Sequence, residues 1–207
     1  SFPTRRSSDL AFPVVLMGWA SCSHSGTGHA ALPDPRAVDK SVPEYKNPFH
    51  PSTYAHFVAR KDYRKTYDVY KDDTLLNRQP KKSRKIFVCL DEQRGQYLVD
   101  GLVAMDFPLS SGVKAYPTKT GDYAVISKKE DHTSNLYGKM YDAEGKCINY
   151  NAESTDPVPE GGRFDGSPMP YWQRLTNAGL GLHVGRVRRH PVSHGCVRLP
   201  RNVAEIL

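Results

Sequence analysis

The chain has 207 residues, of which 38% are hydrophobic and 25% charged, and it carries a formal net charge of +7 at pH 7. This length suits one compact domain with a tethering segment, because domains usually span roughly 100–200 residues. The basic balance invites a nucleic-acid interpretation, but no zinc-finger, helix-turn-helix or RNA-binding signature accompanies it, and a solvated basic face is the simpler explanation.

The first 22 residues indicate two segments outside the folded domain. Residues 1–10 resemble the in-frame translation of a sequencing-library adapter, so we exclude them from fold reasoning as we would a fusion scar. Residues 11–22 contain an apolar run as long as the core of an export signal and far too short to span a bilayer. We therefore expect an exported protein of the cell envelope or periplasm.

The same segment ends in Ala20-Ser21-Cys22, which is similar to the end of a bacterial lipobox, where the cysteine is lipidated. Trp19 stands where that motif usually has leucine. The sequence leaves open a lipid anchor at Cys22 and an ordinary secretory signal.

Residues 23–84 are predicted to connect this signal to the folded body. The part up to residue 52 is rich in Ser, Gly, Pro and His and has no hydrophobic period, which is typical of a linker. The remainder is basic and rich in tyrosine. Its residues Tyr63, Tyr67 and Tyr70 have helical spacing, which predicts a short helix.

From residue 85 onward the pattern is that of a mostly antiparallel β domain. Short β-branched and aromatic runs alternate with turn residues, and Asp100-Gly101 predicts a type I′ hairpin. There is no βαβ alternation and no internal repeat, so we expect a β-sandwich or half-barrel with short helices. The runs that predict strands are 86–90, 96–99, 122–127, 171–175 and 180–184.

The last residues predict an amphipathic helix that begins at Pro200 and buries Val203, Ile206 and Leu207. No capping residue follows them. We therefore expect the domain 85–207 to be incomplete at its C-terminus.

The segment from His183 to Cys196 brings an imidazole, a small-residue turn and a thiol together in the sequence. A cysteine is a nucleophile as its thiolate, and a neighbouring imidazole is the commonest means of forming one near neutral pH. Gly195 leaves room for a substrate carbonyl to approach Cys196 and for backbone N–H groups to face an oxyanion. The pattern predicts a cysteine nucleophile.

The sequence Ser-His-Gly-Cys-Val-Arg at 193–198 resembles the signature of the L,D-transpeptidases, whose YkuD-type catalytic domain cross-links peptidoglycan. Other ordered segments resemble the same family. They are the hairpin 86–101, the FPLSSG and YPTKTG segments within 107–121, DHTSNLYG at 131–138 and MPYW at 169–172. The resemblance implies a YkuD-like β fold over residues 85–207.

This resemblance also implies roles for individual residues. Cys196 matches the nucleophile, and His183 matches the general base that later returns the proton. The backbone carbonyl of Val184 would orient the imidazole. Backbone N–H groups of Gly195 and Cys196 would form the oxyanion hole.

The flanking residues have less defined roles. Ser193 and His194 would shape the turn, and Arg198 would either brace the loop or meet a substrate carboxylate. Tyr171 and Trp172 either line a substrate groove or pack in the core.

Each of these residues has an alternative interpretation. Cys196 could be a small buried hydrophobe, and His183 a structural histidine, with His194 as the competing base. A zinc site made of His183, His190, His194 and Cys196 fits no standard spacing. A disulfide between Cys89 and Cys147 is allowed in an oxidising compartment.

The reaction implied by the resemblance is a peptide-bond exchange on peptidoglycan stem peptides. The thiolate attacks the carbonyl of the third residue of a donor tetrapeptide, expels D-Ala and forms a thioester, which an acceptor amine resolves as a 3→3 cross-link. No metal or organic cofactor and no nucleic acid takes part. The alternatives are water as acceptor in an L,D-carboxypeptidase, attachment of an envelope lipoprotein, and a degenerate envelope-binding module.

Overall fold

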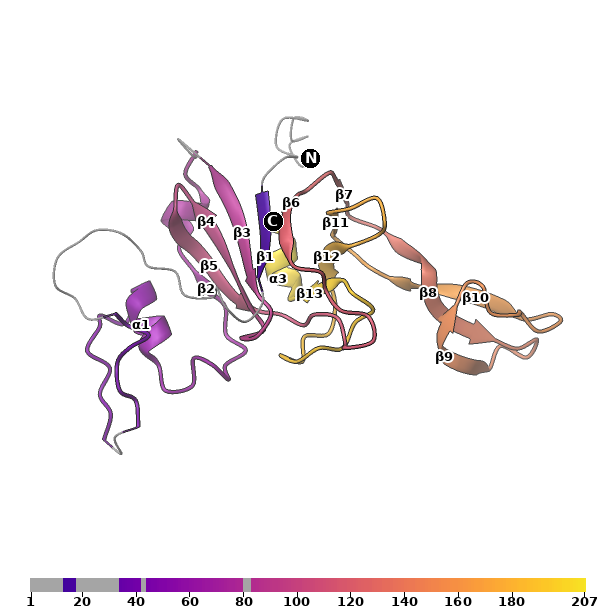
Figure 1. Ribbon diagram of the computed structural model, residues 1–207, viewed down its shortest axis with the longest axis horizontal. Coiled ribbons are helices and arrows are strands. Elements are labelled where there is room, and N and C mark those ends of the chain that lie inside the picture. Colours follow the sequence, from indigo (N-terminus) through magenta and orange to yellow (C-terminus); the bar gives the residue numbers. More distant parts are fainter. Residues whose placement is uncertain (1–12, 18–33, 42–43, 80–82) are drawn as a thin grey trace.

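The computed structural model describes residues 13–17, 34–41, 44–79 and 83–207 (Figure 1). These residues form three open β-sheets and short helices, which confirms the mostly β fold class. Two of the sheets pack together, and the third projects away from them, opposite the end that carries α1. Among the described residues no helix is both long and apolar enough to cross a bilayer.

The largest sheet has six strands in the order β2-β5-β4-β3-β1-β6. Its hairpin between β4 and β5 turns at Asp100 and Gly101, whose φ angles are 52° and 85°. Both values are positive, as a type I′ turn requires, so the hairpin prediction is confirmed. The strands are β1 (Pro13–Met17), β2 (Tyr70–Lys71), β3 (Arg84–Cys89), β4 (Arg94–Val99), β5 (Leu102–Pro108) and β6 (Gly121–Ala124).

Strand β1 comes from the apolar run that the sequence assigns to an export signal. It pairs in parallel with β3 and antiparallel with β6, so it is an inner strand. Val14 and Leu16 are buried in the core, and Val15 is buried on the other face. A short β-branched run is equally suited to a buried strand, which is the environment this segment has in the structure. Cys22 lies outside the described residues.

The second sheet has the order β13-β12-β11-β7, and the third has the order β10-β8-β9. The third sheet is inserted between β7 and β11 in the chain, and the strand signals of the sequence did not predict it. The strands are β7 (Ser127–Lys129), β8 (Thr133–Tyr141), β9 (Cys147–Glu153), β10 (Arg163–Pro168), β11 (Trp172–Arg174), β12 (Gly181–Val184) and β13 (Val197–Leu199).

The main hydrophobic core joins the first two sheets. Ile86 and Phe107 from the first pack in one cluster with Leu182 and Val197 from the second, and all four are fully buried. The short helix α3 (Arg201–Ala204) follows Pro200 and closes this core, as the sequence predicts, but it ends before Ile206 and Leu207. The core thereby fixes β12 and β13 in place.

The helix predicted over Tyr63, Tyr67 and Tyr70 is wrong. The helix of this region is α1 (Tyr54–Ala59), capped by Thr53, and a second one, α2 (Asp73–Leu76), follows β2. Tyr70 instead begins β2, paired with Asp106 of β5. Tertiary pairing and hydrogen bonding to β5 override the helical spacing.

The cysteines differ in state. Cys89 is disulfide-bonded, whereas Cys147 and Cys196 are free thiols. The disulfide considered between Cys89 and Cys147 is therefore not formed. The two residues belong to different sheets, since Cys89 ends β3 and Cys147 begins β9.

Candidate active site

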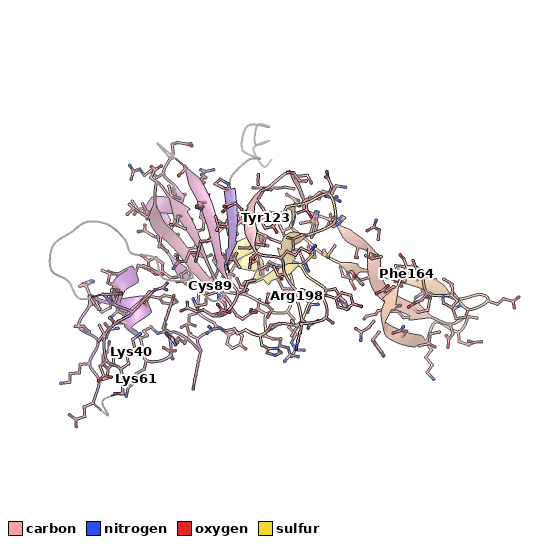
Figure 2. The ribbon with its side chains drawn as sticks, in the orientation of Figure 1. Lys40, Lys61, Cys89, Tyr123, Phe164 and Arg198 are labelled. Atoms are coloured by element: carbon pink, nitrogen blue, oxygen red, sulfur yellow. The ribbon has the colours of Figure 1, made fainter. Side chains whose placement is uncertain are left out.

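Strands β12 and β13 bring the two ends of the predicted motif together. They pair in parallel, with His183 opposite Arg198 and Leu182 opposite Val197. Because side chains alternate along a strand, the core takes Leu182 and Val197, and the opposite face carries His183 and Arg198. Cys196 directly precedes β13 and shares the face of Arg198. Figure 2 shows Arg198 in the middle of the molecule.

His183 is only 7% exposed, and its Nδ1 lies 2.8 Å from the carbonyl oxygen of Val184. A carbonyl accepts, so Nδ1 carries the proton and Nε2 keeps a lone pair. The pKa of His183 is lowered to about 4, chiefly by burial and also by the charges of Arg198 and His132, while the hydrogen bond to Val184 opposes this shift. The imidazole is therefore neutral near pH 7 and has a free nitrogen to accept a proton.

Cys196 is half-buried, and its Sγ donates to the carbonyl of Gly179 at 3.3 Å. Burial raises the pKa of this thiol, while a hydrogen bond from the Gly181 backbone and the charge of Arg198 lower it. The net shift is upward, so the resting group is a thiol. The site thus pairs a neutral thiol with a neutral imidazole.

The turn before Cys196 is held by Ser193, which is 3% exposed. Its Oγ donates to the carbonyl of Cys196 and accepts the N–H of Gly195 at 3.2 Å. Gly195 has a φ of +111°, a conformation that other residues rarely adopt. Of the two N–H groups expected to face an oxyanion, that of Gly195 is directed into the turn, which leaves the N–H of Cys196.

Thr118 fastens this turn to the segment around Gly112. Its hydroxyl accepts the N–H of Gly112 at 2.8 Å and donates to the carbonyl of Gly195 at 2.6 Å. A Cβ on Gly112 would lie 2.8 Å from the Cα of Gly195, so only glycine allows this approach. The sequence showed Thr118 and Gly112 within the FPLSSG and YPTKTG segments but did not indicate that they brace the cysteine.

A comparison with protein-family models identifies the family of this domain. The model of the YkuD L,D-transpeptidase catalytic domain matches residues 83–207, more than half of the chain. The chain belongs to the YkuD L,D-transpeptidase family. No curated protein matches it.

Solved structures similar to the chain include three L,D-transpeptidases. The one from Stackebrandtia nassauensis is 21% identical, with 73% of this chain and 58% of that chain covered and a TM-score of 0.42. The one from Mycobacterium smegmatis is 20% identical, with 57% and 54% covered and a TM-score of 0.41. The catalytic domain from E. faecium is 28% identical, with 59% and 85% covered and a TM-score of 0.41. The chain thus spans little more than half of the first two.

In this YkuD domain Trp172 lies beside His183 on the same face of the second sheet. It is 2% exposed, and a Cβ on Gly181 would lie 2.4 Å from its ring. His132 stacks on the indole with ring centroids 5.0 Å apart, and His183 lies 6.2 Å from it. His132 belongs to the DHTSNLYG segment, and its position on Trp172 emerges only from the fold.

Tyr171 has a different environment from its neighbour. It packs against the main core, and Arg201 lies over its ring at 5.5 Å. The structure therefore places Tyr171 with the core beneath α3, whereas Trp172 is the residue next to His183.

His194 is exposed and contacts two tyrosine rings of the YkuD domain. Its ring stacks on Tyr137 with centroids 4.4 Å apart, and it contacts Tyr116 in a tilted arrangement at 4.7 Å. Tyr137 belongs to β8, so His194 joins the motif to the projecting sheet. Aromatic stacking, in addition to the turn, accounts for its position.

Two further cationic side chains lie on this face of the second sheet. Lys129 of β7 is opposite Trp172, and Arg174 of β11 is opposite Gly181. Alternation thus places both on the face of His183 and Arg198. Burial first, and then the charges of Lys129 and Arg174, lower the pKa of His132. Among the described residues no group of three or more His, Cys, Asp or Glu side chains is placed to hold a metal ion.

Proposed function

We propose that the protein is an L,D-transpeptidase that forms 3→3 cross-links between peptidoglycan stem peptides through a thioester on Cys196. The observation that carries the proposal is the fixed tautomer of His183. With Nδ1 donating to the carbonyl of Val184, Nε2 is the basic nitrogen on the sheet face that also carries Cys196. This is the arrangement of a nucleophile, a base and a group that orients the base.

In the first half-reaction the Nε2 of His183 takes the proton of Cys196 as the sulfur attacks the carbonyl of the third stem residue. The carbonyl oxygen becomes an oxyanion, for which the N–H of Cys196 is the proposed donor. Collapse of this intermediate breaks the bond to D-Ala, whose nitrogen receives the proton from His183. The product is a thioester and free D-Ala.

In the second half-reaction an acceptor amine attacks the thioester and gives a proton to His183. The carbon–sulfur bond breaks, and the proton returns to the sulfur. Proton transfer accompanies attack in both directions, because the resting thiol and imidazole are both neutral. The cycle is balanced without a metal or an organic cofactor.

The charge of the site supports an anionic peptide as donor. Arg198, Arg174 and Lys129 occupy the face of the second sheet that carries His183. Stem peptides carry free carboxylates, which such groups attract at short range. Because these substrates occur outside the cytoplasmic membrane, we propose an exported protein of the cell envelope or periplasm.

The test incubates the full chain with disaccharide-tetrapeptides and follows both the products and the protein by mass. Cross-linked dimers with loss of D-Ala and a covalent adduct on the protein are expected. Tripeptides without dimers would mean that water is the acceptor, as in an L,D-carboxypeptidase. Binding to sacculi without loss of D-Ala would contradict both activities and indicate a degenerate binding module.

The matched variants are Cys196→Ala and Cys147→Ala, because Cys196 and Cys147 are both free thiols. We expect the first to abolish the adduct and the second to retain it. Equal loss in both variants would mean that Cys196 is not the nucleophile.

A further inference from the structure

Residues 53–70 precede the matched family domain, yet they are bound to it by a buried polar network. Tyr54 and Tyr63 both donate their hydroxyls to Oδ2 of Asp106, at 2.7 and 2.8 Å. Asp106 lies on β5 and is completely buried. A buried carboxylate is tolerated only when it is paired and hydrogen-bonded, so this segment completes the environment that Asp106 needs.

Arg94 of β4 supplies the opposite charge. It is 2% exposed, and its Nε lies 2.6 Å from Oδ1 of Asp106. Its Nη1 donates to the backbone carbonyl of Thr66 at 3.2 Å, and its guanidinium lies 4.8 Å from the ring centre of Tyr63. Arg94 therefore joins the ion pair within the sheet to the backbone of residues 53–70.

A second guanidinium reaches the same carbonyl from the loop that leads to Cys196. Nη1 of Arg189 donates to the carbonyl of Thr66 at 2.8 Å, and its Nη2 donates to that of Glu92 at 3.0 Å. Arg189 has a φ of +57°, an uncommon value for a side chain of this size. Beside it, the hydroxyl of Tyr67 donates to the carbonyl of Arg188 at 3.2 Å.

The loop passes from these contacts directly into the catalytic turn. Val192 and Ser193 donate their N–H groups to the carbonyl of Ser111 at 2.8 and 3.1 Å. An unbroken chain of contacts thus runs from Asp106 through Arg94, the Thr66 carbonyl and Arg189 to the turn that holds Cys196.

We propose that residues 53–70 form a positioning element of the catalytic site and that Arg189 is the residue through which they act. The proposal rests on the proposed function, since the geometry it sets is that of Cys196. Displacement of a nucleophile by about 1 Å can cost on the order of a hundredfold in rate. The functional unit then includes residues 53–70 in addition to the matched domain, residues 83–207.

The test compares Arg189→Gln with Arg186→Gln in the full chain. Arg186 is an exposed arginine of the same loop, so it controls for the loss of one charge. We expect Arg189→Gln to lower kcat for D-Ala release by about tenfold or more, with KM little changed. Arg189→Lys, which keeps the charge and one donor, is expected to restore part of the rate.

A second readout needs no substrate. Amide hydrogen exchange over residues 188–196 should become faster in Arg189→Gln and Tyr67→Phe, while exchange in β4 and β5 of these variants should change little. In the control Arg186→Gln, exchange over residues 188–196 should stay near that of the wild type. Unchanged exchange in the loop of Arg189→Gln, or a uniform rise across the domain, would overturn the positioning role. Absence of D-Ala release in the wild-type chain would refute the proposed function alone, because the exchange comparison would still be valid.

Discussion

The Nδ1 atom of His183 lies 2.8 Å from the carbonyl oxygen of Val184, the next residue in the chain. The orienting group is therefore part of the backbone, and any residue at position 184 supplies it. In a triad with an acidic third member, by contrast, one side chain fixes the base. The proposed base is held by the same strand that carries it.

We first predict that Val184→Ala keeps most of the activity whereas His183→Gln loses it. The carbonyl remains in Val184→Ala, so acylation of Cys196 should fall only a few-fold. Loss of the base should cost about 10²–10⁴ in rate. The measurement is the rate of adduct formation with a tetrapeptide donor. A comparable loss in both variants would mean that the side chain at 184 has a role of its own.

A second prediction concerns stability in acid. The pKa of His183 is lowered from 6.5 to about 4 by burial. Between these two pH values the unfolded chain binds the proton and the folded chain does not. The contribution of His183 to the free energy of unfolding is therefore complete above pH 6.5 and is lost as the pH falls toward 4. A shift of this size corresponds to about 3 kcal/mol.

Denaturant unfolding of the wild type, His183→Gln and His190→Gln between pH 7.5 and 4.5 measures this effect. His190 is exposed and serves as the control. The free energy of unfolding should fall less between pH 7.5 and 4.5 in His183→Gln than in the wild type. His190→Gln should show the same fall as the wild type. Parallel curves for the wild type and His183→Gln would contradict the assigned burial effect.

The third prediction uses the charge of Arg198, which lowers the pKa of both Cys196 and His183. Arg198→Gln should raise both values by up to about one pH unit. Alkylation of Cys196 by iodoacetamide as a function of pH reports the thiol directly. The midpoint should move upward in Arg198→Gln and stay near the wild type in Arg198→Lys. A downward or absent shift in Arg198→Gln would count against a charge effect.

The fourth prediction concerns Thr118, whose hydroxyl joins Gly112 to the carbonyl of Gly195. Thr118→Val keeps the shape and removes the hydroxyl, so the buried N–H of Gly112 and the partly buried carbonyl of Gly195 lose a partner. A buried group left without a partner costs about 1–3 kcal/mol. We expect slower acylation and a lower melting temperature. Thr118→Ser keeps the hydroxyl and should retain both properties, and equal effects of the two substitutions would assign the role to the methyl group.

Local sequence signals predicted the parts of the fold that depend on neighbours in the chain. The positive φ values at Asp100 and Gly101 follow from their residue types, and α3 follows from Pro200 and the apolar spacing after it. The resemblance indicated that His183 and Cys196 belong to one site, and the register of β12 and β13 pairs His183 with Arg198, two residues after Cys196.

Local sequence signals could not predict contacts between residues that are far apart in the chain. Asp106, Thr66 and Arg189 are far apart in the chain, and no periodicity relates a carboxylate on β5 to a backbone carbonyl before β2. The projecting sheet was missed for another reason. Its strands are largely exposed, with Ile148 and Tyr150 at 50% and 69%, so they lack a regular apolar face.

Strand β1 has a consequence for how the protein is handled. Its five residues separate β3 from β6, so their loss would turn both neighbours into bare edges and uncover the surface on which Val14 and Leu16 pack. Unpaired strand edges beside exposed apolar surface are templates for association between chains. A chain trimmed to the matched domain would keep every motif residue and yet be prone to aggregate. Inactivity of such a chain in an assay would then reflect aggregation and not the chemistry of Cys196.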